Sequence, residues 1–117
     1  MSIENVLASV AVRDIESAAG WYEQILGRPG KKPMAEVAEW TFPRGGSLQV
    51  YELPERAGNG SFTLTVDDIT EVESTLARMG LDASERSSND SVDTLMVTDP
   101  DGNHIAFAQA HDSALSR

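Results

Sequence analysis

A β-hairpin is predicted by the sequence Val97-Thr-Asp-Pro-Asp-Gly-Asn-His-Ile-Ala-Phe-Ala-Gln109. Its centre, Asp99-Pro-Asp-Gly102, has the chemistry of a tight turn, because proline presets φ and glycine accepts positive φ. After the turn, Ile105 and Phe107 alternate with alanines. This period of two is typical of a strand with two different faces.

An earlier stretch of the chain repeats this hairpin. It is Phe42-Pro-Arg-Gly-Gly-Ser-Leu-Gln-Val-Tyr-Glu52, with a turn sequence like that of Pro100-Asp-Gly102. Aligning the two turns pairs Leu48 with Ile105, Gln49 with Ala106, Val50 with Phe107 and Glu52 with Gln109. The chain therefore looks like two copies of one unit.

Each copy is also predicted to begin with a strand and an amphipathic helix. The related sequences Val12-Arg-Asp-Ile15 and Val66-Asp-Asp-Ile69 place an Asp where a helix N-cap belongs. Apolar residues then recur at helical spacing until Gly27 in the first copy and Gly80 in the second. With a short strand between helix and hairpin, each copy becomes a βαβββ module.

The two modules are expected to form one α+β domain over residues 1–117, with module 1 at about 5–53 and module 2 at about 61–109. One face of each sheet covers its helix, and the other face cannot be buried by a single module. Two modules set edge to edge therefore predict a curved, U-shaped mixed sheet with helices on its outer face and a cleft inside. Residues 27–33 are expected to form a loop, and the serine-rich stretch 82–93 a flexible edge or lid.

Composition excludes several classes of function. The 117 residues contain no cysteine, so disulfides, thiolate metal sites and a cysteine nucleophile are absent. The net charge of −10 argues against nucleic acid or an anionic membrane as a partner. It would suit a cationic ligand, although solubility alone also accounts for it. Without a signal-like or membrane-spanning apolar run, the expected location is the cytoplasm.

The sequence resembles the vicinal oxygen chelate superfamily, which contains glyoxalases, bleomycin-resistance proteins and extradiol dioxygenases. The likeness rests on the two Val-x-Asp-Ile motifs, on Trp21-Tyr22 followed by Leu26-Gly27, and on Asp99-Pro-Asp-Gly-Asn103. It covers roughly residues 5–109. The resemblance implies paired βαβββ modules and usually a homodimer, sometimes with exchanged modules. Whether the modules pair within one chain or between chains stays open.

Enzymes of this superfamily hold a divalent metal on the cleft floor, with one ligand from each of four strands. The resemblance places these four positions at Leu7, Gln49, Ser61 and Ala106. Leucine and alanine offer no lone pair, and a hydroxyl or neutral amide is a poor ligand for a divalent transition metal. We therefore expect no metal and no cofactor, with a degenerate metal site as the alternative.

Strand alternation predicts which side chains line the cleft. The predicted ligand-binding residues are Leu7, Ser9, Gln49, Tyr51, Ser61, Thr63, Ala106 and Ala108. Small residues with a few hydroxyls, one amide and one phenol fit a moderately apolar organic ligand. A groove closed by these side chains, or a dimer contact, is the competing interpretation.

The leading hypothesis is a metal-free small-molecule-binding protein of the glyoxalase/bleomycin-resistance type, whose organic ligand, such as an antibiotic, lies in the cleft. The alternative is a glyoxalase-like lyase or isomerase, or a dioxygenase, with an atypical metal site or metal-independent acid–base chemistry. Candidate catalytic residues are Tyr51, His104 and Glu39, although a solvated His104 and a water-facing Glu39 are the simpler interpretations. A module with a vestigial cleft is a third hypothesis.

Overall fold

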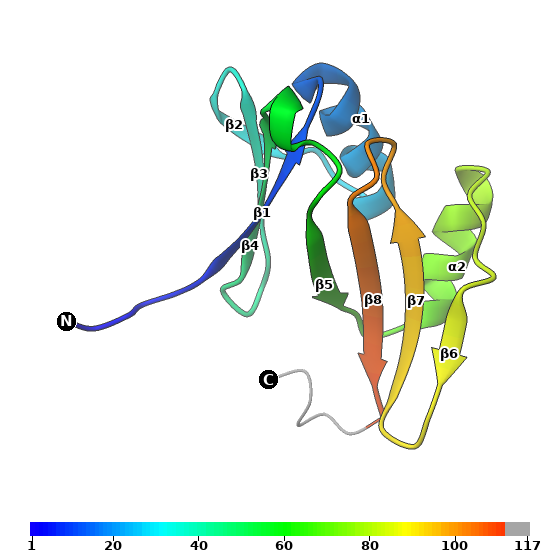
Figure 1. Cartoon of the computed structure of the whole chain (residues 1–117). Helices are drawn as coiled ribbons and strands as arrows, with labels where there is room; N and C mark the ends of the chain where they lie inside the picture. The colour runs from blue at the N-terminus through cyan, green and yellow to red at the C-terminus, as the bar shows by residue number, and fades with distance from the viewer. Residues whose placement is uncertain (112–117) are drawn as a thin grey trace. The chain divides into compact units, whose positions relative to one another are not determined.

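A computed structural model describes residues 1–111 of the chain. The chain divides into two compact units. Unit 1 comprises Met1–Gly60 together with Pro100–Asn103, and unit 2 comprises Ser61–Asp99 and the chain from His104 onward. Each unit contains one βαβββ module with its own four-stranded mixed sheet (Figure 1). The predicted α+β class and the two-module plan are confirmed.

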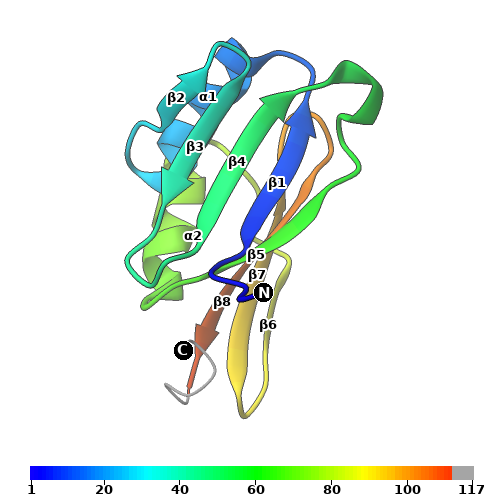
Figure 2. The same cartoon turned by 90° about the vertical axis from the view of Figure 1, so that its left-hand side faces the viewer.

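Unit 1 carries the first sheet and the first helix. Its elements are β1 (Leu7–Val12), α1 (Ile15–Leu26), β2 (Lys31–Met34), β3 (Val37–Thr41), β4 (Ser47–Glu52) and the short 3₁₀ helix η1 (Pro54–Arg56). The strand order is β1-β4-β3-β2, with β1 parallel to β4 and the other pairs antiparallel. Figure 2 shows these strands side by side, with α1 behind them.

The first helix begins and ends where the sequence predicts. The Asp14 carboxylate accepts a hydrogen bond from the backbone N–H of Glu16, and Gly27 ends the helix with a φ of 82°. Its buried residues are Ile15, Ala18, Tyr22 and Ile25, which pack toward β3 and β4. The 3–4 spacing of these apolar side chains therefore gives the helix its core-facing side.

The predicted loop at 27–33 was wrong at its end, because β2 begins at Lys31. Backbone pairing of Lys31 with Glu39 and of Met34 with Val37 produces this strand, although all four of its residues are exposed. Pro33 is tolerated because β2 is the edge strand of the sheet. Tertiary pairing has thus overridden the local turn composition.

Unit 2 repeats the plan. Its elements are β5 (Ser61–Thr65), α2 (Ile69–Arg78), β6 (Arg86–Ser88), β7 (Val92–Thr98) and β8 (His104–Ala110), in the strand order β5-β8-β7-β6. The helix begins at Asp68, whose carboxylate accepts from the Thr70 N–H. The exposed edge strand β6 lies within the serine-rich stretch 82–93. No helix among the described residues is long and apolar enough to cross a membrane.

Candidate ligand-binding site

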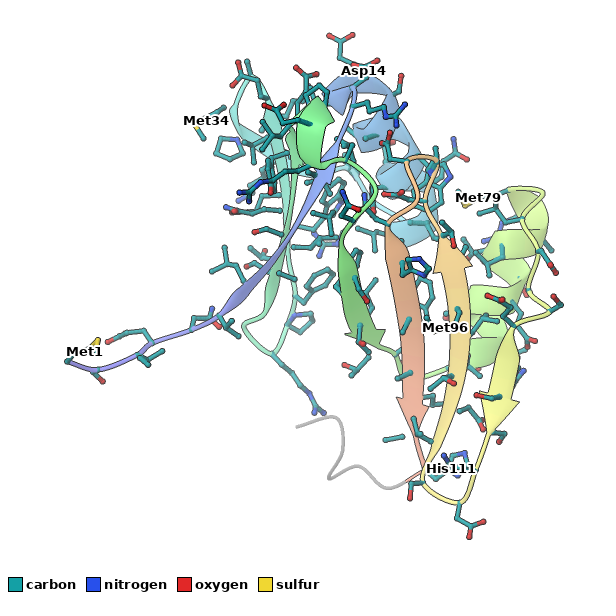
Figure 3. The ribbon with its side chains drawn as sticks, in the orientation of Figure 1. Met1, Asp14, Met34, Met79, Met96 and His111 are labelled. Atoms are coloured by element: carbon teal, nitrogen blue, oxygen red, sulfur yellow. The ribbon has the colours of Figure 1, made fainter. Side chains whose placement is uncertain are left out.

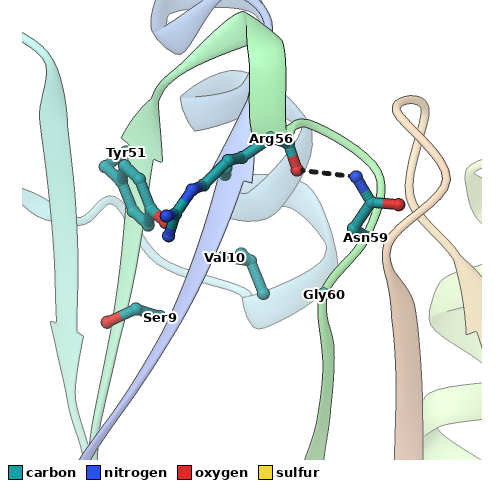
Figure 4. Close-up of a pocket in the computed structure, with 7 residues that line it drawn as sticks. Ser9, Val10, Tyr51, Arg56, Asn59 and Gly60 are labelled. Carbon is teal, nitrogen blue, oxygen red and sulfur yellow. Dashed lines mark hydrogen bonds between the residues drawn. The ribbon is translucent and has the colours of Figure 1, made fainter.

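Unit 1 contains a pocket of about 360 Å³ (Figure 4). It is lined by Ser9, Val10, Ala11, Tyr51, Arg56, Asn59 and Gly60. This volume is at the lower end of the range for small-molecule sites. The lining combines an aromatic ring and aliphatic groups with hydroxyl, amide and guanidinium groups, so the pocket has the chemistry to hold and orient an organic ligand.

Strand register places the two predicted residues of this pocket on one face of the sheet. Ser9 lies opposite Gln49, and Ala11 lies opposite Tyr51, in the parallel β1–β4 pair. Side chains two residues apart on a strand point to the same face. Ser9 and Tyr51 therefore both project away from α1, and the structure brings them together in the pocket as strand alternation predicts.

The remaining wall comes from the segment after β4. Arg56 ends η1, and the Asn59 side-chain amide donates a hydrogen bond to the Arg56 backbone carbonyl at 3.3 Å. Figure 4 shows the Arg56 side chain directed across the pocket toward Tyr51. Arg56 and Asn59 are not among the residues predicted from the sequence, because strand alternation does not reach the segment after β4. Polar side chains in an irregular segment at a strand end were the available signal.

A buried asparagine supports this wall. Asn103 is fully buried in unit 1, and its side-chain amide donates to the Ala11 carbonyl at 2.9 Å. Its side-chain oxygen accepts from the Gly60 N–H at 2.8 Å. A Cβ at Gly60 would lie 2.8 Å from a methyl of Val10. The final residue of the Asp-Pro-Asp-Gly-Asn motif thus fixes two pocket residues by their backbones.

A polar row continues across the same sheet face. Ser9 pairs with Gln49, and Gln49 pairs with Glu39. The Gln49 amide donates a hydrogen bond of 2.7 Å to the Glu39 carboxylate, and both side chains are half-buried. Glu39 therefore belongs to this row, and its carboxylate is bound to Gln49. Leu7 lies one row further along β1, where its side chain is exposed.

The predicted residues of the second module share a face of their own sheet. Ser61 pairs with His104, and Thr63 pairs with Ala106. At the alternate positions, Phe62, Ile105 and Phe107 are buried, and β8 packs against α2. Ser61, Thr63, Ala106 and Ala108 therefore point away from α2, and their part in ligand binding stays a prediction. His104 is exposed at the start of β8, which favours the solvated interpretation of this histidine.

The side chains at the four superfamily metal positions do not fit a divalent metal. Leu7 and Ala106 lack donor atoms, and the Gln49 amide and the Ser61 hydroxyl are neutral groups that bind a divalent transition metal poorly. Within the described part of the chain, no three His, Asp or Glu side chains come together as a metal-ligand group. This donor chemistry provides no basis for a metal-dependent mechanism.

The clearest electrostatic shifts lie on unit 2, at the outer edge of its sheet. The pKa of His111 is raised, first by its hydrogen bond to the Asp90 backbone carbonyl and then by the Asp93 carboxylate, 3.1 Å away. Arg86 contacts Glu73 at 2.6 Å and Asp93 at 3.6 Å. Figure 3 shows His111 just beyond the end of β8, beside the turn that joins β6 to β7. These contacts connect β6, β7 and α2, so their role is structural.

Comparisons with known proteins identify the family. No protein-family model and no curated protein matches the sequence. Among solved structures, a glyoxalase/bleomycin resistance protein from Catenulispora acidiphila DSM 44928 is 34% identical, with a TM-score of 0.81 over 92% of this chain and 98% of that chain. The chain therefore belongs to the glyoxalase/bleomycin-resistance proteins of the vicinal oxygen chelate superfamily.

Two further solved structures are similar. TnmS3, an antibiotic binding protein from Streptomyces sp. CB03234, is 25% identical, with a TM-score of 0.77 over 94% of this chain and 98% of that chain. A bleomycin resistance determinant encoded on the transposon Tn5 is 19% identical, with a TM-score of 0.72 over 94% of this chain and 100% of that chain. The second likeness concerns the fold alone.

Proposed function

We propose that this protein is a metal-free binding protein that sequesters a small organic molecule, such as an antibiotic. The observation that carries the proposal is the pocket of unit 1, with Tyr51 beside the hydroxyl of Ser9 and the polar groups of Arg56 and Asn59. The antibiotic-binding description of TnmS3 supports the same class of ligand. Binding and orientation are all that these side chains need to provide.

The polar groups have different tasks in this proposal. The Tyr51 ring offers an apolar surface, and its hydroxyl donates or accepts a hydrogen bond. Ser9 adds a second hydroxyl from the neighbouring strand. A few such groups fix the orientation of a ligand whose affinity comes mainly from apolar contact.

Several predictions remain part of this proposal. Leu7, Gln49, Ser61, Thr63, Ala106 and Ala108 stay predicted ligand-binding residues, in addition to those of the pocket. We also keep the predicted single domain over residues 1–117, the homodimer and the cytoplasmic location. Of the predicted residues, Ser61, Thr63, Ala106 and Ala108 would extend the binding site to unit 2.

A second candidate function is enzymatic. The hydrogen-bonded Glu39–Gln49 pair and Tyr51 lie on the same sheet face, which places a carboxylate and a phenol on one surface. Such groups serve general acid–base catalysis when both reach the substrate. A glyoxalase-like lyase or isomerase, or a dioxygenase, would lose turnover in both the Glu39→Gln and Tyr51→Phe variants. Unchanged turnover of an identified substrate in both variants would remove these assignments.

The test of sequestration combines metal content with ligand binding. The protein is loaded with nickel, zinc, manganese or ferrous iron, dialysed, and measured by native mass spectrometry. We expect the mass of the metal-free chain, and then a rise in melting temperature with at least one member of an antibiotic panel that includes bleomycin. Isothermal titration calorimetry should confirm that this ligand binds, and mass spectrometry of the released ligand should find it unaltered.

Tyr51→Ala should abolish that thermal shift, whereas Tyr51→Phe should keep most of it if ring contact supplies the affinity. Circular dichroism checks that both variants fold. One tightly held metal per chain would contradict the metal-free proposal. An unchanged melting temperature across the whole panel would instead support the vestigial-cleft hypothesis.

A further inference from the structure

The charge of the pocket differs in sign from that of the whole protein. The chain has a net charge of −10, which by itself would suit a cationic ligand. Of the described residues that line the pocket, Arg56 is the one with a formal charge at neutral pH. Salt screens charges beyond about 8 Å at physiological ionic strength. For a ligand inside the pocket, the Arg56 guanidinium in its lining therefore outweighs any carboxylate that lies farther away than this distance.

The Arg56 guanidinium is available to a ligand. Other arginines are engaged: Arg13 lies 3.7 Å from Asp101, and Arg86 lies 2.6 Å from Glu73. Arg56 forms no ion pair with any described residue, and its side chain crosses the pocket toward Tyr51 (Figure 4).

We propose that the pocket of unit 1 selects aromatic ligands that carry a carboxylate or another planar oxyanion, with Arg56 binding the oxyanion and Tyr51 contacting the ring. This inference rests on the proposed binding function and adds the charge class of the ligand. A guanidinium presents two parallel N–H donors that match the two oxygens of a carboxylate. The hydrogen bond from Asn59 to the Arg56 carbonyl holds the backbone from which that side chain extends.

The half-buried carboxylate on this sheet face, that of Glu39, does not oppose an anionic ligand directly. Glu39 lies two strands away from β1, does not line the pocket, and accepts a hydrogen bond from Gln49. The other polar lining groups are neutral and include the Ser9 hydroxyl, a donor that an oxyanion can use. The lining is therefore suited to a negative group at its Arg56 side.

Three probes with one ring system and different charges test this inference. They are 2-naphthoate, 2-naphthamide and 2-naphthylmethylammonium, each titrated into the ¹⁵N-labelled full chain and followed by two-dimensional NMR. We expect 2-naphthoate to shift the backbone amides of Ser9, Tyr51 and Gly60. Its dissociation constant should be about 10-fold lower than that of the amide probe, as expected for one charge-assisted hydrogen-bonded pair.

Variants at Arg56 assign the effect. Arg56→Gln should lower the affinity for 2-naphthoate about 10-fold, because the substitution removes the charge and the forked donor pair. The affinity for 2-naphthamide should change by no more than about 2-fold. The affinity of Arg56→Lys for 2-naphthoate should lie between those of the unsubstituted protein and of Arg56→Gln, since lysine keeps the charge but not the forked donor pair. Arg78→Gln is the matched control, because Arg78 is an exposed arginine on α2 of unit 2. It makes the same change in net charge and should leave all three affinities unchanged.

Stronger binding of the ammonium probe, or equal loss of 2-naphthoate affinity in the Arg56 and Arg78 variants, would overturn the charge preference. Binding of the amide or ammonium probe at the same three residues would still support the proposed binding function. If none of the probes shifts these amides, the oxyanion inference is wrong. The antibiotic panel then judges the binding function independently.

Discussion

In unit 1 the Glu52 carboxylate accepts a hydrogen bond of 3.1 Å from the Ile15 N–H, and in unit 2 the Gln109 amide oxygen accepts one of 2.8 Å from the Ile69 N–H. Both acceptors stand at the same place in the repeat, near the end of the strand that is parallel to the first strand of the module. In both modules a side-chain oxygen thus accepts a hydrogen bond from the first N–H of the helix. The acceptor is a carboxylate in unit 1 and a neutral amide in unit 2.

The opposite sheet faces differ much more. Gln49 and Tyr51 of β4 correspond to Ala106 and Ala108 of β8, so polar and aromatic groups in unit 1 become methyl groups in unit 2. The side of each sheet that packs on a helix is therefore chemically similar in the two modules, and the other side has diverged. Tyr51, which lines the pocket, belongs to the diverged side, which is where a repeated scaffold can acquire a specific function.

The largest expected effect concerns the turn residue in which the two hairpins differ. Asn103 is fully buried with two side-chain hydrogen bonds, whereas its counterpart Gly46 is exposed. Asn103→Ala should lower the free energy of unfolding by about 3 kcal/mol, because it leaves the Gly60 N–H and the Ala11 carbonyl without this partner. Urea denaturation followed by circular dichroism measures the loss.

Asn89→Ala provides the comparison within unit 2. The side chain of this exposed asparagine also forms two hydrogen bonds. Its oxygen accepts from the N–H groups of Ser91 and Val92. Water replaces its contacts, so we expect a cost of about 1 kcal/mol or less. Equal losses in the Asn89 and Asn103 variants would show that burial does not set the importance of Asn103.

The sequence predicted the elements because their signals are local. Asp14 and Asp68 cap the two helices as expected, and alternation correctly assigned Ser9 and Tyr51 to one sheet face. Arg56 was missed because its position depends on contacts distant in sequence. Gly58, two residues after Arg56 and with a φ of 88°, shows such a contact. It lies so close to the distant turn that an added Cβ would be 2.2 Å from the Asp101 carbonyl oxygen.

Exchanging the two helix-terminal acceptors sharpens the comparison of modules. Glu52→Gln gives unit 1 the acceptor type of unit 2 and should change the free energy of unfolding by less than about 0.5 kcal/mol, since the amide oxygen still accepts from Ile15. Glu52→Ala removes the acceptor and should cost about 1–2 kcal/mol. Thermal and urea denaturation at neutral pH distinguish these values. A Gln variant as unstable as the Ala variant would show that the carboxylate charge is required.

The two N-caps should give nearly equal effects. Asp14→Ala and Asp68→Ala should each lower the free energy of unfolding by about 1 kcal/mol. Asp14 should be slightly more important, because its carboxylate also accepts a hydrogen bond of 2.9 Å from the Ser17 hydroxyl. Urea titration of both variants and of Ser17→Ala tests this order. A larger loss for Asp68→Ala would contradict it.

The smallest expected effect depends on pH and distinguishes the outer edges of the two sheets. Both edge strands are exposed, but no ion pair among the described residues includes a residue of β2, whereas Arg86 of β6 pairs with Asp93, which also contacts His111. Since folding raises the pKa of His111, its protonated form is favoured by the native state. This stabilisation is complete below the unfolded pKa of about 6.5 and disappears as the pH rises through the higher folded pKa.

His111→Gln should therefore lower the melting temperature more at pH 5.5 than at pH 8.5. The pKa of Asp93 is lowered, and the hydrogen bond from the Ser88 hydroxyl is the largest cause of this shift. The Asp93 carboxylate therefore remains charged at both pH values. His104→Gln is the matched control, because that histidine is exposed at the start of β8 and forms no ion pair with Asp93. A difference for His111→Gln that grows toward pH 8.5 would mean that the neutral imidazole, rather than its ion pair with Asp93, stabilises this edge.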